Sequence, residues 1–109
     1  NMEYINVRDL VPKIDAFVKF QRVAGQRMSA HFGTPLVELK SRRFPKRWDY
    51  VSADHTIIGD AKYLSLVRKI ADPLAKLMEI AANVWLLERT QATVRFLVFG
   101  NQRKYRSFG

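Results

Sequence analysis

One stretch of this 109-residue chain decides its fold: Trp48-Asp49-Tyr50-Val51-Ser52-Ala53-Asp54-His55-Thr56-Ile57-Ile58-Gly59-Asp60-Ala61-Lys62. Two runs rich in β-branched and aromatic residues flank a polar segment, and this predicts a β-hairpin with strands over roughly 47–53 and 56–64. With a two-residue loop at Asp54-His55, Val51 lies opposite Ile58 and Asp49 lies opposite Asp60. Asp54 and His55 are then turn residues, because an aspartate stabilises turns through local hydrogen bonds.

The hairpin brings two acids and a lysine together. Side chains alternate between the faces of a strand, so Asp60 and Lys62 share one face and Ala61 lies on the other. Directly opposed like charges destabilise a sheet, so Asp49 and Asp60 need positive charge between them. Mg²⁺ takes oxygen ligands and commonly uses one or two carboxylates plus a phosphate. The sequence therefore predicts a Mg²⁺ site between Asp49 and Asp60, with Lys62 close to the phosphate. The alternative is an exposed aspartate beside a surface ion pair.

Two helices flank the hairpin in the sequence. Apolar residues at helical spacing predict one helix over 10–32, and Gly33 followed by Pro35 ends it. A second apolar stripe predicts a helix from Pro73 to about Thr90.

Two further strands complete the predicted fold. Residues 36–44 indicate a strand with a basic end, and 92–99 form a near-continuous apolar run that suits a buried central strand. Residues 65–72 either extend the hairpin or form a turn of helix. The predicted fold class is therefore α/β, with the order αβββαβ and a central mixed sheet flanked by helices.

The hairpin and the element order resemble the PD-(D/E)xK, or restriction-endonuclease-like, nuclease superfamily. In that superfamily an acid near the start of one strand precedes an acid-x-lysine triplet on the next, and Asp49, Asp60 and Lys62 match these positions. The resemblance implies a restriction-endonuclease-like core and Mg²⁺- or Mn²⁺-dependent hydrolysis of phosphodiester bonds, in DNA rather than RNA. Many members also carry a glutamate on the first helix, where this chain has Ser29.

The resemblance assigns roles to these residues. Asp49, Asp60 and Lys62 are the expected catalytic residues, and Asp49, Asp60 and Ala61 are the expected metal ligands. Ser29 favours an alternative, in which the chain is a catalytically inactive nucleic-acid-binding or protein-interaction module on the same fold. A homodimer and a larger multidomain protein are both compatible with the family.

The net charge of +9 and the isoelectric point of about 10.3 favour an anionic partner such as nucleic acid. A basic cluster with an adjacent tryptophan is the predicted nucleic-acid-binding surface: Arg42, Arg43, Lys46, Arg47 and Trp48. The arginines and the lysine would contact phosphates, and Trp48 would stack on a base. The alternatives are a protein that is simply basic, and a charged loop beside a tryptophan that belongs to the core.

Length and composition limit the remaining choices. A chain of 109 residues allows one domain over 1–109, as a whole protein or as a piece of a longer one. The chain contains no cysteine, which fits a reducing cytoplasm and excludes thiolate metal sites. No apolar run is long enough to span a membrane, so no membrane partner is expected. His31 and His55 lack the spacing of zinc ligands. Glu38 is either a solvated strand residue or a further ligand in the metal shell.

Overall fold

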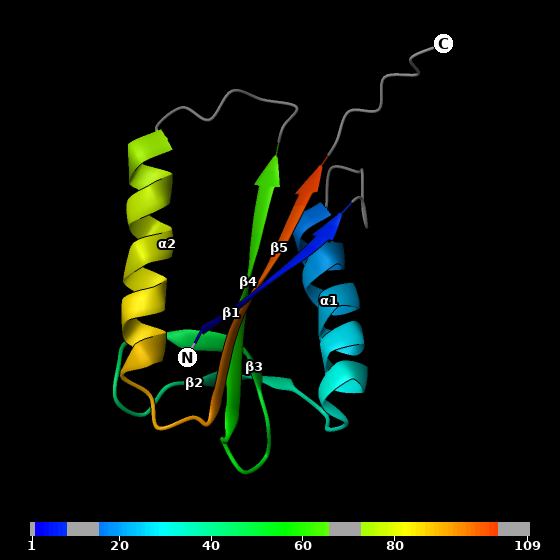
Figure 1. The fold of residues 1–109 in the computed structure, drawn as a ribbon, viewed down its shortest axis with the longest axis vertical. Coiled ribbons are helices and arrows are strands. Elements are labelled where there is room, and N and C mark those ends of the chain that lie inside the picture. Colours follow the sequence, from blue (N-terminus) through cyan, green and yellow to red (C-terminus); the bar gives the residue numbers. More distant parts are fainter. Residues whose placement is uncertain (1, 9–15, 66–72, 103–109) are drawn as a thin grey trace.

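The predicted hairpin lies inside a five-stranded mixed sheet in the computed structural model of the chain (Figure 1). The structure describes residues 2–8, 16–65 and 73–102. The elements in chain order are β1 Met2–Arg8, α1 Ala16–Phe32, β2 Val37–Lys40, β3 Arg47–Val51, β4 Ile57–Ser65, α2 Pro73–Glu88 and β5 Val94–Gln102.

The strands lie in the order β1-β5-β4-β3-β2. β2, β3 and β4 form an antiparallel meander, whereas β5 is parallel to both β4 and β1. Parallel neighbours need a crossover connection, and α2 supplies it between β4 and β5. α1 and α2 lie on opposite faces of the sheet, so the fold has three layers (Figure 1). This confirms the predicted α/β class with a mixed sheet between helices.

Each face of the sheet has its own apolar core. Under α1, buried side chains four residues apart on the helix pack against β3, β4 and β5: Phe20, Ala24, Met28, Tyr50, Ala61, Phe96 and Val98. Under α2, a second cluster is centred on β3 and β5: Trp48, Val51, Ile58, Leu87, Ala92 and Leu97. β5 contributes to both clusters, as expected of a central strand whose apolar run is almost unbroken.

The register of the hairpin is as predicted, but its loop is longer. Val51 pairs with Ile58, and Tyr50 pairs with Gly59. Beyond the end of β3, the Ser52 amide still donates to the Ile57 carbonyl, which leaves a turn of four residues, 53–56, instead of two, and His55 adopts a left-handed conformation with φ of 62°. The Asp54 carboxylate accepts hydrogen bonds from the Ser52 hydroxyl and from both the amide and hydroxyl of Thr56. The loop gains one residue from each strand, so the register does not change.

The other elements differ from the predictions mainly at their ends. The strand β1 was not predicted, and it makes the order βαβββαβ in place of αβββαβ. The predicted strand over 36–44 is confined to Val37–Lys40, because the chain turns at 41–46, where the Ser41 hydroxyl accepts hydrogen bonds from the amides of Arg43 and Phe44. The predicted start of the first helix at residue 10 and the segment 66–72 lie outside the described residues.

Small residues allow close packing around β4. A Cβ atom added at Gly59 would overlap the Phe96 ring of the neighbouring strand β5, so the space at this position is filled by a strand side chain. Gly33 ends α1 with φ of 69°, and the amides of Gly33 and Thr34 donate to Ala30 and Ser29 carbonyls, which is the Schellman arrangement. Among the described residues, neither helix has the length and apolar character needed to cross a bilayer.

Candidate functional site

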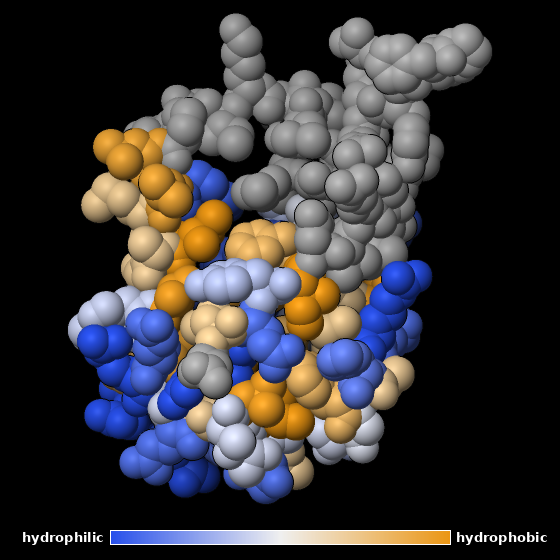
Figure 2. Space-filling model, in the orientation of Figure 1, coloured by the Kyte–Doolittle hydropathy of each residue, from blue (hydrophilic) through white to orange (hydrophobic). Residues whose placement is uncertain are grey.

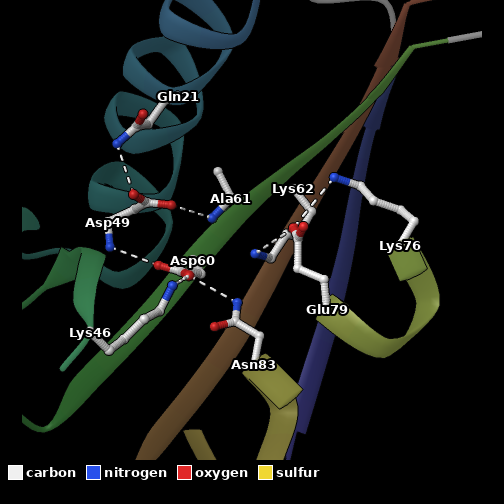
Figure 3. A network of polar contacts seen from close by, with 9 residues as sticks. All are labelled: Gln21, Lys46, Asp49, Asp60, Ala61, Lys62, Lys76, Glu79 and Asn83. Carbon is white, nitrogen blue, oxygen red and sulfur yellow. Dashed lines mark hydrogen bonds and ion pairs between the residues drawn. The ribbon is translucent and has the colours of Figure 1, made fainter. Parts of the chain in front are cut away.

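Asp49 and Asp60 meet where β3 and β4 stop pairing through their backbones. The Asp49 amide donates to Asp60 Oδ1 at 2.8 Å, and the Ala61 amide donates to Asp49 Oδ2 at 2.8 Å (Figure 3). Each carboxylate is thus held by the backbone of the opposite strand. The two acids are neighbours, as the hairpin register predicted.

Asp60 is the more enclosed of the two acids, with 1% of its surface exposed. Its Oδ2 accepts from the Lys46 ammonium at 2.5 Å and from the buried side-chain amide of Asn83 on α2 at 2.9 Å. Buried charges require a partner of opposite charge together with hydrogen bonds, and Asp60 has both. The positive charge beside the acid pair in this structure is therefore Lys46.

Asp49 is held from the other face of the sheet. Its Oδ1 accepts from the Gln21 side-chain amide of α1 at 2.9 Å (Figure 3). The Gln21 carbonyl in turn accepts from the Tyr50 hydroxyl at 2.6 Å, so the position of Gln21 is fixed at two points. Ser29, the position matched to the helix glutamate of the superfamily, instead accepts from the Leu36 amide. The residue of α1 that reaches the acid pair is Gln21.

Burial raises the pKa of Asp49 to about 7. The negative charge of Asp60 and a hydrogen bond shared with its carboxyl group raise the pKa further, while the Ala61 amide and the Lys46 ammonium act in the opposite direction. One ammonium group does not fully neutralise two adjacent carboxylates in a site with little water. The pair therefore has room for additional positive charge, and Asp49 exchanges a proton near neutral pH.

Lys62 lies on the same face of β4 as Asp60, as predicted, because both contact α2. Asp60 accepts from Asn83, whereas the Lys62 ammonium lies 3.5 Å from Glu79 Oε2 (Figure 3). Lys76 also reaches Glu79, at 3.4 Å. Partial burial acts to raise the pKa of Glu79, but Lys62 and Lys76 outweigh it and lower that pKa. In this structure Lys62 is thus paired with an ionised glutamate instead of with the two aspartates.

The predicted basic cluster is divided between different roles. Arg42 and Arg43 are exposed, and the Arg43 guanidinium donates to the Arg89 carbonyl. Arg47 lies 4.0 Å from Glu38, and Lys46 belongs to the acid site. Trp48 is 2% exposed and packs in the core under α2, which corrects the expectation that it stacks on a base. The alternative of a charged loop beside a core tryptophan is correct for this residue.

A groove of about 900 Å³ runs between α1 and the strands β2 and β3, and Asp49 is part of its wall. Glu38 also lines this groove, but it pairs with Arg47. Among the described residues, no group of three or more acidic, histidine or cysteine side chains is arranged to hold a metal ion. The minority prediction that Glu38 completes a metal shell therefore has no such cluster to support it.

The donor set nevertheless suits a hard divalent cation. Asp49 and Asp60 present oxygen atoms from adjacent strands, and such cations are commonly held by one or two carboxylates with water and substrate phosphate completing the shell. The Lys46 ammonium is already bound to one of these oxygens. A metal ion at this pair would have to displace Lys46.

Comparison of the chain with models of known protein families, with curated proteins and with solved structures finds no match. The function of the chain is therefore inferred from the geometry of the site.

Three partners of the acid pair were not predicted from the sequence. Gln21 and Asn83 lie on helices whose rotation about their axes cannot be fixed by periodicity alone, and each is a polar residue next to an apolar stripe. Lys46 was expected in the nucleic-acid-binding surface. A signal was present for Lys46, since two adjacent acids require a nearby cation and Lys46 lies three positions before Asp49.

Proposed function

We propose that this protein is a divalent-metal-dependent nuclease that hydrolyses phosphodiester bonds in nucleic acid, DNA in preference to RNA. The observation that carries this proposal is the pair Asp49 and Asp60, held by five different donors beside a groove that is open to solvent on the Asp49 side. The αβββαβ portion of the fold, without β1, has the element order of the PD-(D/E)xK superfamily, and this order supports a restriction-endonuclease-like core.

In this proposal Asp49 and Asp60 hold Mg²⁺ or Mn²⁺, with the Ala61 carbonyl as a further ligand. The bound cation would polarise a phosphoryl oxygen and lower the pKa of a bound water. Gln21 and Asn83 orient the two carboxylates by donating to one oxygen of each. Such second contacts fix ligand geometry at metal sites. Lys62 then leaves Glu79 and stabilises the negative charge that develops on the phosphate.

The partner in this proposal is a nucleic acid. The net charge of +9 and the exposed Arg42 and Arg43 support contact with phosphates. A chain without cysteine suits the cytoplasm, which is the location we propose.

A second function is favoured by one observation. Lys46 already supplies a cation to Asp60, and Lys62 is occupied by Glu79. An inactive nucleic-acid-binding or protein-interaction module on the same fold would have an acid pair that is neutralised in this way by its own lysine. The two functions differ in whether metal ions confer cleavage.

A cleavage assay separates them. The chain is incubated with plasmid, linear duplex, single-stranded DNA and RNA in Mg²⁺, in Mn²⁺ and in EDTA. We expect cleavage that depends on the metal, and we expect Lys62→Ala to reduce its rate by about a hundredfold or more while binding is retained. Lys76→Ala is the matched control, because Lys76 contacts the same glutamate but lies outside the acid pair. Binding without cleavage by the unaltered chain would favour the inactive module.

A further inference from the structure

The outward face of α2 is apolar. Leu74, Leu77, Met78 and Trp85 are each more than half exposed, and Ala81 and Ala82 are exposed among them. Figure 2 shows hydrophobic surface along the upper part of this helix. These six residues form the α2 stripe. A large exposed apolar patch on a protein surface generally marks an interaction site.

Three of the four charged or amide residues of α2 contact one another or the sheet, and the fourth, Glu88, is exposed at the end of the helix. Lys76 and Glu79 are directed toward Lys62 of the sheet, and Asn83 is buried against Asp60. The face toward the sheet also carries Ile80, Val84 and Leu87. A helix that is apolar on both faces is typical of a buried helix, whereas an ordinary surface helix is polar on its outer side. The α2 stripe is therefore suited to burial against another surface.

The spacing within the stripe matches the seam of a helix pair. Leu74, Met78, Ala81 and Trp85 are separated by four, three and four positions. This is the alternating three- and four-residue spacing of a coiled-coil seam over about three turns, in which such residues fit between those of a facing helix. Another α2 offers the same surface, and a two-fold axis would bring the two stripes together as one self-complementary interface.

An antiparallel pairing also fits the sizes of the side chains. When the stripe is centred on itself, Met78 faces Ala81 of the second copy, Leu77 faces Ala82, and Leu74 faces Trp85. Large residues thus oppose small ones at the middle of the seam, and a leucine opposes a tryptophan at each end. A parallel pairing would put alanine against alanine and tryptophan against tryptophan, which leaves a void beside an overcrowded layer.

Charge favours the same surface. The whole chain carries a net charge of +9, so two copies repel one another over most of their surface. α1 has one lysine and two arginines and lacks an acidic residue, whereas α2 has one lysine and two glutamates. Contact through α2 therefore avoids the repulsion between basic surfaces that contact through α1 would bring.

We propose that α2 is a homodimer interface in which the α2 stripes of two copies pack antiparallel. The stripe extends for about 16 Å from Leu74 to Trp85 at 1.5 Å per residue. Its six residues are few beside the roughly 20–30 residues per side of a standard stable interface. The dimer is accordingly a weak one that forms at micromolar or higher concentration. This inference does not depend on the proposed nuclease function.

The first experiment is sedimentation equilibrium over a wide range of concentration. The unaltered chain should pass from monomer to dimer as concentration rises. Met78→Lys and Ala81→Glu should each remain monomeric, since each puts a charge into the seam and both new residues are good helix formers. Val18→Lys is the matched control, because Val18 is an equally exposed apolar residue on α1 and its replacement should leave the dimer intact. Thermal unfolding of each variant verifies that it is folded.

Mixing the two monomeric variants tests the register. In the antiparallel pair the new lysine of one chain faces the new glutamate of the other, so an equimolar mixture of Met78→Lys and Ala81→Glu should form heterodimers. A parallel pair would bring position 78 against position 78. The new lysine and the new glutamate would then not face one another, and the mixture would form no heterodimers. An unaltered chain that stays monomeric at millimolar concentration, a mixture that fails to associate, or loss of the dimer in Val18→Lys would each overturn the proposal.

Discussion

At the scale of single residues, the central feature is a pair of carboxylates with too little positive charge around it. Asp60 has Lys46 and Asn83 as partners, whereas the donors to Asp49 in the described part of the chain are neutral, namely Gln21 and the Ala61 amide. Burial and the proximity of Asp60 therefore raise the pKa of Asp49 to about 7. A carboxyl group with such a raised pKa beside a groove is typical of functional sites.

The shifted pKa predicts how stability depends on pH. Asp49 titrates near 3.8 in the unfolded chain and near 7 in the folded one. Between these values the folded state binds more protons, so the contribution of Asp49 to stability is full below pH 3.8 and is lost as pH rises through 7. Thermal unfolding from about pH 4 to 8 should show a melting temperature that declines, and Asp49→Asn should flatten this decline.

Asp54 provides the control for that measurement. Hydrogen bonds from the Thr56 side chain and amide and from Ser52 lower the pKa of Asp54 to about 2. Its contribution to stability is lost only as pH falls through that lower value, so Asp54→Asn should keep the decline between about pH 4 and 8. A decline of the same size in Asp49→Asn as in the unaltered chain would contradict the assignment to Asp49.

At the scale of secondary-structure elements, the hairpin and its register could be predicted, because alternating apolar residues and a polar turn are local signals. The same holds for the end of α1 at Gly33 and for the apolar run of β5. β1 was missed because it pairs in parallel with β5, about 90 residues further along the chain, and such pairing leaves no local pattern.

The site was predictable only in part, for a related reason. Strand alternation placed Asp60 and Lys62 on one face, and the register brought Asp49 next to Asp60. The partners Gln21 and Asn83 come from helices that pack on opposite faces of the sheet. Their positions depend on how each helix lies over the sheet, which is a property of the packed core and not of either helix alone.

The loop between β2 and β3 carries a prediction about binding. Arg42 and Arg43 are exposed on this loop, so each is available to a phosphate. Each lost phosphate contact should flatten the slope of log affinity against log salt by about 0.7–0.9. With a DNA duplex in EDTA, Arg42→Ser/Arg43→Ser should therefore reduce the slope by up to about 2.

A pair of equally charged residues elsewhere is the control for this prediction. Arg27→Ser/Lys76→Ser removes the same charge from the two helices and should leave most of the slope in place. Equal slopes for the two double variants would mean that the loop makes no special contact with phosphates. The anion-binding surface would then have to be sought on another part of the chain.

At the scale of the whole molecule, the two candidate interaction surfaces lie on opposite sides of the sheet. The groove beside Asp49 lies between α1 and the meander, whereas the α2 stripe lies on the outer side of α2. The acid site joins the two sides of the sheet, since Asn83 of α2 donates to Asp60 while Gln21 of α1 donates to Asp49. An antiparallel dimer through α2 would leave both grooves accessible on the outer faces of the pair.

Calorimetric titration with Mn²⁺ near pH 8 tests the central claim, that Asp49 and Asp60 form a divalent-cation site. The unaltered chain should bind one ion, and Asp60→Asn should lose this binding because the pair loses half of its charge. Lys46→Met should bind Mn²⁺ more tightly, since the competing ammonium is removed, and should melt at a lower temperature without metal because two buried carboxylates are then left unpaired. Absence of binding in both the unaltered chain and Lys46→Met, or equal binding in Asp60→Asn, would contradict the claim.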